Sequence, residues 1–174
     1  MNGTPSFEGR RTASSTSDED KGRTQHPPLK HMIMKKINFY YGLGDRASNY
    51  KAFSKYFNII KIDWNKPEKV KSPRCDIAVG FSMGCLLALD YIEKHRVKKL
   101  ILCSLPPCEK LGAVNANEII FMAGSKEKFI LKNIRSLAKK LSQKTKYRII
   151  VVPRADHRIV REYKKRLLEI TTNI

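Results

Sequence analysis

The chain has 174 residues, of which 41% are hydrophobic, and it carries a formal net charge of +19. This length supports one domain with a hydrophobic core, and the lack of an apolar run of about 20 residues excludes a membrane-spanning helix. The four cysteines show no metal-ligand spacing, so neither a metal nor another cofactor is expected. Reduced, mostly buried thiols are typical of a cytoplasmic protein.

The positive charge lies almost entirely after residue 34, where 30 Lys/Arg face 12 Asp/Glu, a net +18. Such an excess attracts anionic partners, whether nucleic acid, phospholipid, acidic protein or phosphorylated substrate. The alternative is codon bias, because Lys, Ile and Asn are residues that AT-rich genes encode often. Composition leaves both explanations open.

Residues 1–33 are expected to form a disordered leader, followed by a single folded domain at 34–174. The leader is polar and turn-rich and cannot bury enough apolar surface to order itself. It lacks the apolar core of a secretory signal, and its acidic cluster at 18–20 argues against a mitochondrial transit peptide. The junction at 31–34 favours a vector-derived or mis-started leader over a regulatory tail.

The apolar pattern beyond the leader predicts six short strands and four helices. In chain order these are a strand at 37–41, a helix at 47–57, strands at 59–62 and 76–79, a helix from 85 to about 95, strands at 99–103 and 117–122, a long basic helix after residue 124, a strand at 147–152 and a helix at 159–170. Phe129 and Val160 are expected among the inward-facing residues of the last two helices.

Short apolar strands separated mostly by helices predict an α/β fold with a mostly parallel, six-stranded, doubly wound sheet. Right-handed crossovers then place the carboxyl ends of all strands at one edge of the sheet. Active groups are expected to gather at this edge.

A Gly-x-Ser-x-Gly pentapeptide at 80–84 lies between a predicted strand and a predicted helix. This context is typical of a nucleophile elbow, a strained turn that lifts its serine clear of the sheet. Ser82 is therefore the expected nucleophile. The N–H groups of the following helix favour the negative charge that develops during attack.

A serine nucleophile needs a base, and the base needs an acid to orient it. His157 follows the sixth predicted strand at the functional edge and is the expected base, whereas His95 lies at the far end of the elbow helix. Glu127 follows the fifth strand and is the expected acid. Asp156 is the competing acid, although neighbouring side chains diverge and it would reach His157 poorly.

Two backbone N–H groups are expected to form the oxyanion hole. Met83 supplies one, since it directly follows the serine. The other is assigned to Leu43, in the glycine turn at 42–44 that ends the first strand. A phosphate-binding role for this turn is less favoured, because the G-x-G-x-x-G and Walker patterns are absent.

Together, the segments at 41–44, 80–84, 124–127 and 156–157 resemble the landmarks of the α/β-hydrolase superfamily, in its order. The resemblance implies a minimal α/β-hydrolase fold without a lid domain, similar to small esterases and thioesterases. It also implies that Ser82, Glu127 and His157 fill the triad roles. Three features depart from the family pattern: Tyr41 replaces the usual histidine, the acid is Glu rather than Asp, and the chain is short.

The resemblance implies a serine hydrolase that cleaves a carboxylic ester or thioester through an acyl-enzyme. An open site suits a small-molecule or carrier-linked acyl substrate, for example on coenzyme A or an acyl carrier protein. The alternative is a non-catalytic basic binding protein on a hydrolase scaffold, with nucleic acid or an acidic protein as its partner. Nucleic acid is the less expected partner, because no RNA- or DNA-binding motif is present. The oligomeric state is not predicted.

Overall fold

The structure is a computed structural model that describes residues 37–108, 111, 114–141 and 145–172. The predicted leader at 1–33 lies outside the described residues. No helix in the described part of the chain is long and apolar enough to cross a membrane.

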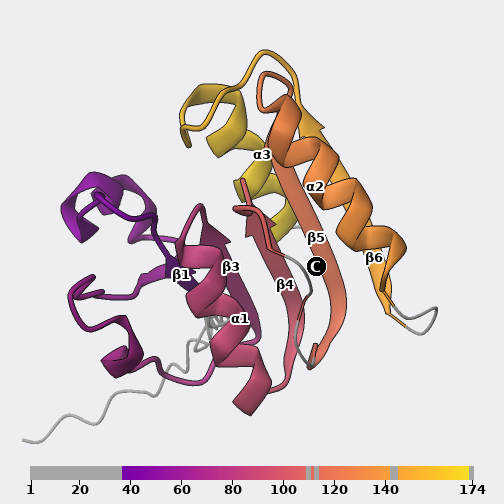
Figure 1. The fold of residues 1–174 in the computed structure, drawn as a ribbon. Helices are drawn as coiled ribbons and strands as arrows, with labels where there is room; N and C mark the ends of the chain where they lie inside the picture. Colours follow the sequence, from indigo (N-terminus) through magenta and orange to yellow (C-terminus); the bar gives the residue numbers. More distant parts are fainter. Residues whose placement is uncertain (1–36, 109–110, 112–113, 142–144, 173–174) are drawn as a thin grey trace, which may run out of the picture. The chain divides into compact units, whose positions relative to one another are not determined.

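The described chain forms a single six-stranded sheet in the order β2-β1-β3-β4-β5-β6 (Figure 1). The strands are β1 (Ile37–Tyr40), β2 (Asn58–Ile59), β3 (Ile77–Phe81), β4 (Val97–Cys103), β5 (Ala116–Gly124) and β6 (Lys146–Val152). Every neighbouring pair is parallel, so the predicted α/β sheet is confirmed. The chain runs outward from β1 to β2 and then returns to β3, which makes the boundary between β1 and β3 the switch point where ligands bind in such sheets.

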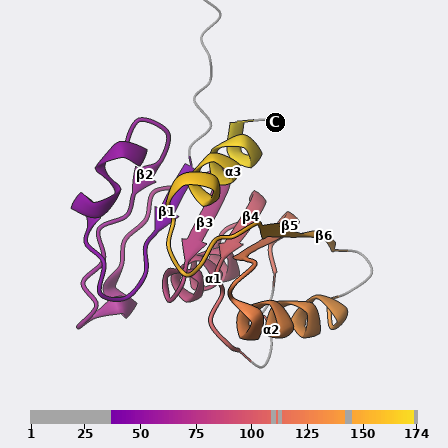
Figure 2. The same ribbon diagram turned by 90° about the horizontal axis from the view of Figure 1, so that it is seen from above.

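Helices cover both faces of the sheet, as Figure 2 shows. The α-helices are α1 (Gly84–Lys94), α2 (Lys128–Lys139) and α3 (Arg161–Thr172), and the 3-10 helices are η1 (Ala47–Phe53) and η2 (Pro67–Lys69). Buried residues of α1 and α2 share one hydrophobic cluster, whereas those of α3 and η1 share another. The sheet is therefore doubly wound, as predicted.

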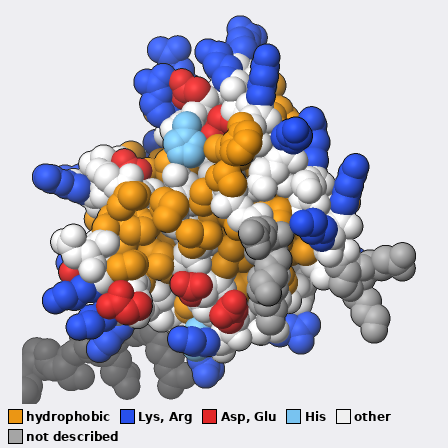
Figure 3. All heavy atoms as spheres, viewed as in Figure 1, with side chains coloured by type: hydrophobic (Ala, Val, Ile, Leu, Met, Phe, Trp, Pro, Cys, Tyr) orange, Lys and Arg blue, Asp and Glu red, His pale blue; other side chains and the backbone are white. Residues whose placement is uncertain are grey.

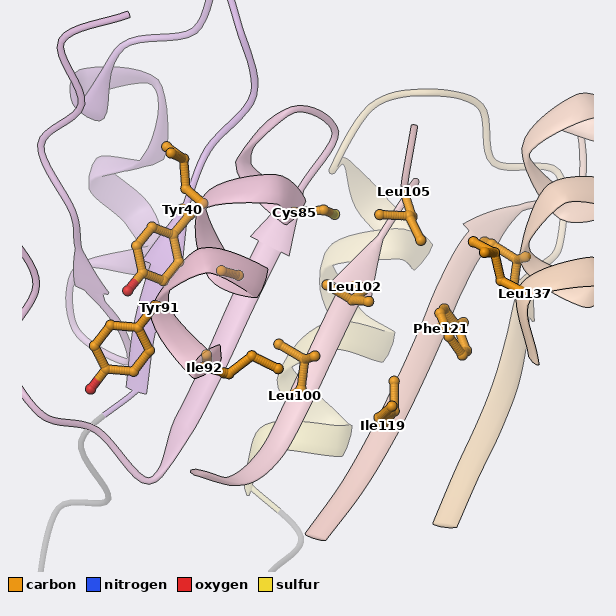
Figure 4. Packing of buried hydrophobic residues seen from close by; sticks show 14 of the residues in the cluster. Tyr40, Cys85, Tyr91, Ile92, Leu100, Leu102, Leu105, Ile119, Phe121 and Leu137 are labelled. Atoms are coloured by element: carbon orange, nitrogen blue, oxygen red, sulfur yellow. The ribbon is translucent and has the colours of Figure 1, made fainter. Parts of the chain in front are cut away.

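Successive residues of the central strands enter opposite clusters, because side chains alternate across a strand. Leu100 and Leu102 of β4 pack toward α1, and Ile101 between them packs toward α3. Figure 4 shows Leu100 and Leu102 beside Ile92 of α1 and Phe121 of β5. Burial on both faces explains why these strands are continuous apolar runs rather than alternating ones.

The first predicted helix and the second predicted strand are shorter than expected. The helix is a 3-10 helix that ends at Phe53, and Tyr50 interrupts it with a non-helical φ of −108°. The strand β2 contains only two residues. Beyond it, the Ile62 N–H donates to the Tyr41 hydroxyl at 2.9 Å, so a side chain replaces the backbone ladder.

The inward positions predicted for Phe129 and Val160 are wrong, since these residues are 70% and 52% exposed. In α2 the buried residues are Leu131, Ile134, Leu137 and Ala138. At 100° per residue, position 129 lies opposite positions 131 and 138 on the helix. Val160 precedes the first residue of α3 and is not part of its buried face.

Candidate active site

Ser82 lies in a strained turn between β3 and α1, with a φ of 52°. The two glycines of the pentapeptide have no room for a side chain. A Cβ on Gly80 would lie 2.4 Å from the Cα of Cys85, and one on Gly84 would lie 2.2 Å from the Tyr40 carbonyl oxygen. The turn therefore has the tight geometry that the sequence predicts for a nucleophile elbow.

The His157 ring lies between a hydroxyl and a carboxylate. Its Nε2 is 2.9 Å from Ser82 Oγ, and its Nδ1 is 2.7 Å from Glu127 Oε1. Because a carboxylate only accepts, Nδ1 carries the proton and Nε2 is free to accept from the serine hydroxyl. The structure thus brings together Ser82, His157 and Glu127 in one hydrogen-bonded chain.

Close packing between two strand ends holds the loop of His157 in place. A Cβ on Gly124 would lie 2.3 Å from the carbonyl oxygen of Ala155, so only glycine lets this loop approach the end of β5. The amide of Lys126 donates to the same carbonyl at 3.1 Å. The side chain of His157 remains 49% exposed, which leaves the ring accessible to substrate and water.

Glu127 is the buried member of the chain, with only 5% of its side chain exposed. While Oε1 accepts from His157, Oε2 accepts from the Gly124 amide at 2.6 Å and from Ser104 Oγ at 2.8 Å. Three donors from three segments therefore fix the orientation of this carboxylate. Hydrogen bonds to a charged group are stronger than neutral ones, so the constraint is substantial.

Asp156, the competing acid, binds a different partner. Its two carboxylate oxygens accept from the Arg158 guanidinium at 2.6 and 3.1 Å. This hydrogen bonding by Arg158 lowers the pKa of the Asp156 carboxyl. His157 is therefore hydrogen-bonded to Glu127 and not to its sequence neighbour Asp156.

The glycine turn after β1 lies directly against the nucleophile. A Cβ on Gly42 would be 3.1 Å from Ser82 Cβ, so the turn and the elbow touch. Leu43 is 61% exposed at its tip, and Met83, the N-cap residue of α1, directly follows the serine. The two segments that carry the predicted oxyanion donors therefore border the same position.

Tyr41, which replaces the usual histidine, is buried on the α3 side of the sheet. Its hydroxyl accepts from the Ile62 N–H and donates to the Ile62 carbonyl at 3.3 Å. Its ring stacks on Tyr50, with centroids 6.0 Å apart. The buried side chain of Tyr41 therefore anchors the start of the glycine turn through its contacts with Ile62 and Tyr50.

The sequence reasoning missed two residues that support the acid. Ser104, which directly follows β4, is fully buried, has a φ of 51°, and contacts both Glu127 and the Tyr163 hydroxyl, the latter at 2.9 Å. Tyr163 in turn donates to the Met122 carbonyl at 2.9 Å. The position of Ser104 at a strand's carboxyl end was a possible signal, but a single serine there is not distinctive.

No family model matches the sequence, and no curated protein matches it. The solved structures that resemble the fold include two esterases. The first is esterase PE8, with a TM-score of 0.52 and 12% identity, and the match covers 81% of this chain and 93% of that chain. The second is the carboxylesterase of Bacillus cereus, with a TM-score of 0.51 and 12% identity, and the match covers 79% of this chain and 87% of that chain. The chain therefore shares the α/β fold of these two structures. Residues 104–115, which join β4 to β5, are too few to form a lid domain.

Proposed function

We propose that the protein is a serine hydrolase that cleaves carboxylic esters or thioesters. The observation that carries this proposal is the hydrogen-bonded chain from Ser82 through His157 to the buried Glu127. A nucleophile, a base and an orienting acid in contact are the parts that acyl transfer to a hydroxyl requires. The likeness to two esterase structures supports the same reaction class.

In the first half of the reaction, Ser82 Oγ attacks the substrate carbonyl while its proton moves to His157 Nε2. The carbonyl oxygen becomes an oxyanion, which the amides of Met83 and Leu43 stabilise. Glu127 stabilises the imidazolium and holds the ring in position. When the tetrahedral intermediate collapses, the alcohol or thiol leaves with the proton from His157, and the acyl group remains on Ser82.

In the second half, water replaces the leaving group. His157 accepts a proton from this water, whose oxygen attacks the acyl-enzyme carbonyl. The second intermediate collapses, the proton returns to Ser82 Oγ, and the carboxylic acid is released. Both halves use the same base and the same oxyanion donors, so the second half requires no further side chain of the protein.

The substrate class we propose is an acyl group on a phosphopantetheine arm, as in coenzyme A or an acyl carrier protein. A hollow of about 840 Å³ beside the loop of His157 is lined by Lys126, Arg154, Arg158 and Arg161. Two carboxylates also line it, but Arg158 pairs with one of them, Asp156. The remaining positive charge suits a phosphate remote from the scissile carbonyl, and binding such a group helps to position the carbonyl.

Steady-state hydrolysis of a short p-nitrophenyl ester and of an acyl-coenzyme A thioester tests the proposal. The wild type should turn over at least one of them, and both Ser82→Ala and His157→Ala should lose nearly all activity while their melting temperatures stay unchanged. Equal activity in wild type and Ser82→Ala would refute the proposal. That result would favour the alternative, a non-catalytic basic binding protein.

A further inference from the structure

The charge of α2 differs from that of the other two α-helices. Its twelve residues include Lys128, Lys132, Arg135 and Lys139, and no Asp or Glu. In contrast, α1 combines two acids with one lysine, and α3 combines four basic residues with two acids, one of which pairs with Arg166. Because all three helices belong to the same chain, codon bias does not explain why only α2 lacks acids.

The four cations of α2 form one row on its surface, which we call the α2 cation row. Their spacing of four, three and four residues repeats the helical period, so they lie on one face. All four are exposed, and no ion pair involving them is found among the described residues. Like charges four residues apart repel, so the row disfavours the isolated helix.

The α2 cation row begins at the candidate active site. Lys128 directly follows Glu127, the partner of His157, and α2 then runs from the carboxyl edge of the sheet back along β5 and β6 (Figure 1). Figure 3 shows Lys and Arg side chains on the side of this face where α2 lies, and Asp and Glu side chains both near the His side chain at the top and lower on the face. Phe129, at the active-site end of the row, is the most exposed large hydrophobic residue described.

We infer that the α2 cation row is the docking surface for an acidic carrier protein, which presents its thioester-bound acyl group to Ser82. This inference rests on the proposed function. The α2 cation row, with about one cation per helical turn, is complementary to a partner helix that carries carboxylates at the same spacing. Phe129, at the active-site end of the row, offers an exposed aromatic side chain of the kind that anchors protein interfaces.

The structure favours a protein over a membrane or a nucleic acid. The apolar face of α2 is buried against the sheet, so this helix has no apolar face to insert into a bilayer. Sequence-tolerant binding of single strands uses several aromatic side chains as stacking platforms, whereas Phe129 is the only aromatic residue of α2. The firm packing of α2 presents a rigid surface, which suits docking between two folded partners.

The test compares one acyl group on two thiols, a holo carrier protein and N-acetylcysteamine, in the full-length enzyme. One variant reverses the row, with Lys128, Lys132, Arg135 and Lys139 each replaced by Glu. The control variant makes four Lys→Glu changes at exposed sites outside α2, so its net charge is the same. Its sites are Lys51, Lys66, Lys69 and Lys71.

Reversal of the row should lower kcat/KM for the carrier-bound thioester by about tenfold or more, because complementary charge raises association rates by this order. It should change kcat/KM for the N-acetylcysteamine thioester by less than about twofold, and the control should be near wild type on both. Wild-type kcat/KM for the carrier should also fall as salt rises.

The outcomes separate this inference from the proposed function. If the wild type hydrolyses neither thioester nor simple esters, the proposed function fails. If it hydrolyses the small thioester but row reversal leaves the carrier substrate unaffected, or the control is equally impaired, the docking inference is overturned. Row-dependent binding to anionic vesicles or to RNA, without an effect on the carrier substrate, would also overturn it.

Discussion

Ser104→Ala tests how the acid of the candidate triad is held. Ser104 Oγ is one of two donors to Glu127 Oε2, and its own oxygen is 2.9 Å from the Tyr163 hydroxyl. The substitution removes the hydroxyl and leaves the Gly124 amide and His157 as donors to the carboxylate. Among the described residues, no hydrogen bond joins Ser104 to the nucleophile or to the predicted oxyanion turn, so Ser104 is expected to act through Glu127.

The expected loss of kcat follows from the strength of the hydrogen bond between Ser104 and Glu127. A hydrogen bond to a charged group contributes about 1.5–3 kcal/mol, and the two remaining donors retain part of the orientation. A loss of about 1–2 kcal/mol in the transition state lowers kcat by about 5- to 30-fold. KM should stay within about twofold, since ground-state substrate binding does not involve this residue.

Steady-state kinetics on a p-nitrophenyl ester measures this effect, with two companion variants. Ser104→Gly also removes the hydroxyl, but glycine adopts the φ of 51° more easily than alanine does. It should therefore show the same loss of kcat as Ser104→Ala and a higher melting temperature than Ser104→Ala. Tyr163→Phe should cost less than Ser104→Ala, and should add nothing in the Ser104→Ala background. An unchanged kcat in Ser104→Ala, or a rise in KM alone, would refute the reasoning.

Three further predictions concern the triad, the elbow and the cysteines. Glu127→Gln should lower kcat by a factor of about 10²–10⁴ in steady-state assays. Asp156→Asn should change kcat by less than about twofold, because the Asp156 carboxylate pairs with Arg158 and not with His157. A larger loss in Asp156→Asn than in Glu127→Gln would show that the acid is misassigned. Gly84→Ala places a Cβ 2.2 Å from a backbone carbonyl of β1, so calorimetry should show melting lowered by about 10 °C or more, and an unchanged transition would contradict the packing. Burial raises the pKa of the Cys85 and Cys103 thiols, so iodoacetamide at pH 8 should modify them only after denaturation, and rapid labelling of the native protein would contradict their burial.

The sheet and the candidate triad could be predicted because one topological rule links them. Parallel strands with right-handed crossovers bring all carboxyl ends to one edge, and Ser82, Glu127 and His157 each follow a different strand. Once the strands were placed, the three residues were expected at one edge without knowledge of side-chain packing. Topology alone does not show which of the three groups are hydrogen-bonded to each other. The side-chain distances show that His157 lies between Ser82 and Glu127.

The supporting residues could not be predicted, because they depend on side-chain contacts between distant segments. Ser104 and Tyr163 are 59 positions apart, and the sequence identifies Tyr163 only as an inward-facing residue of the last helix. The short β2 has a similar cause, since a hydroxyl of Tyr41 takes the hydrogen bond that a longer ladder would use. Phe129 was misplaced because the apolar residues of α2 cover more than one face, and packing selects Leu131 instead.

Labelling with a fluorophosphonate, followed by mass spectrometry of the modified peptide, tests the central claim most directly. This reagent phosphonylates a serine only where a neighbouring base activates it. We expect a single adduct on Ser82 in the wild type, no adduct in Ser82→Ala, and much slower labelling in His157→Ala. An adduct elsewhere in the chain, or no adduct on the folded wild-type protein, would contradict an activated serine at this elbow.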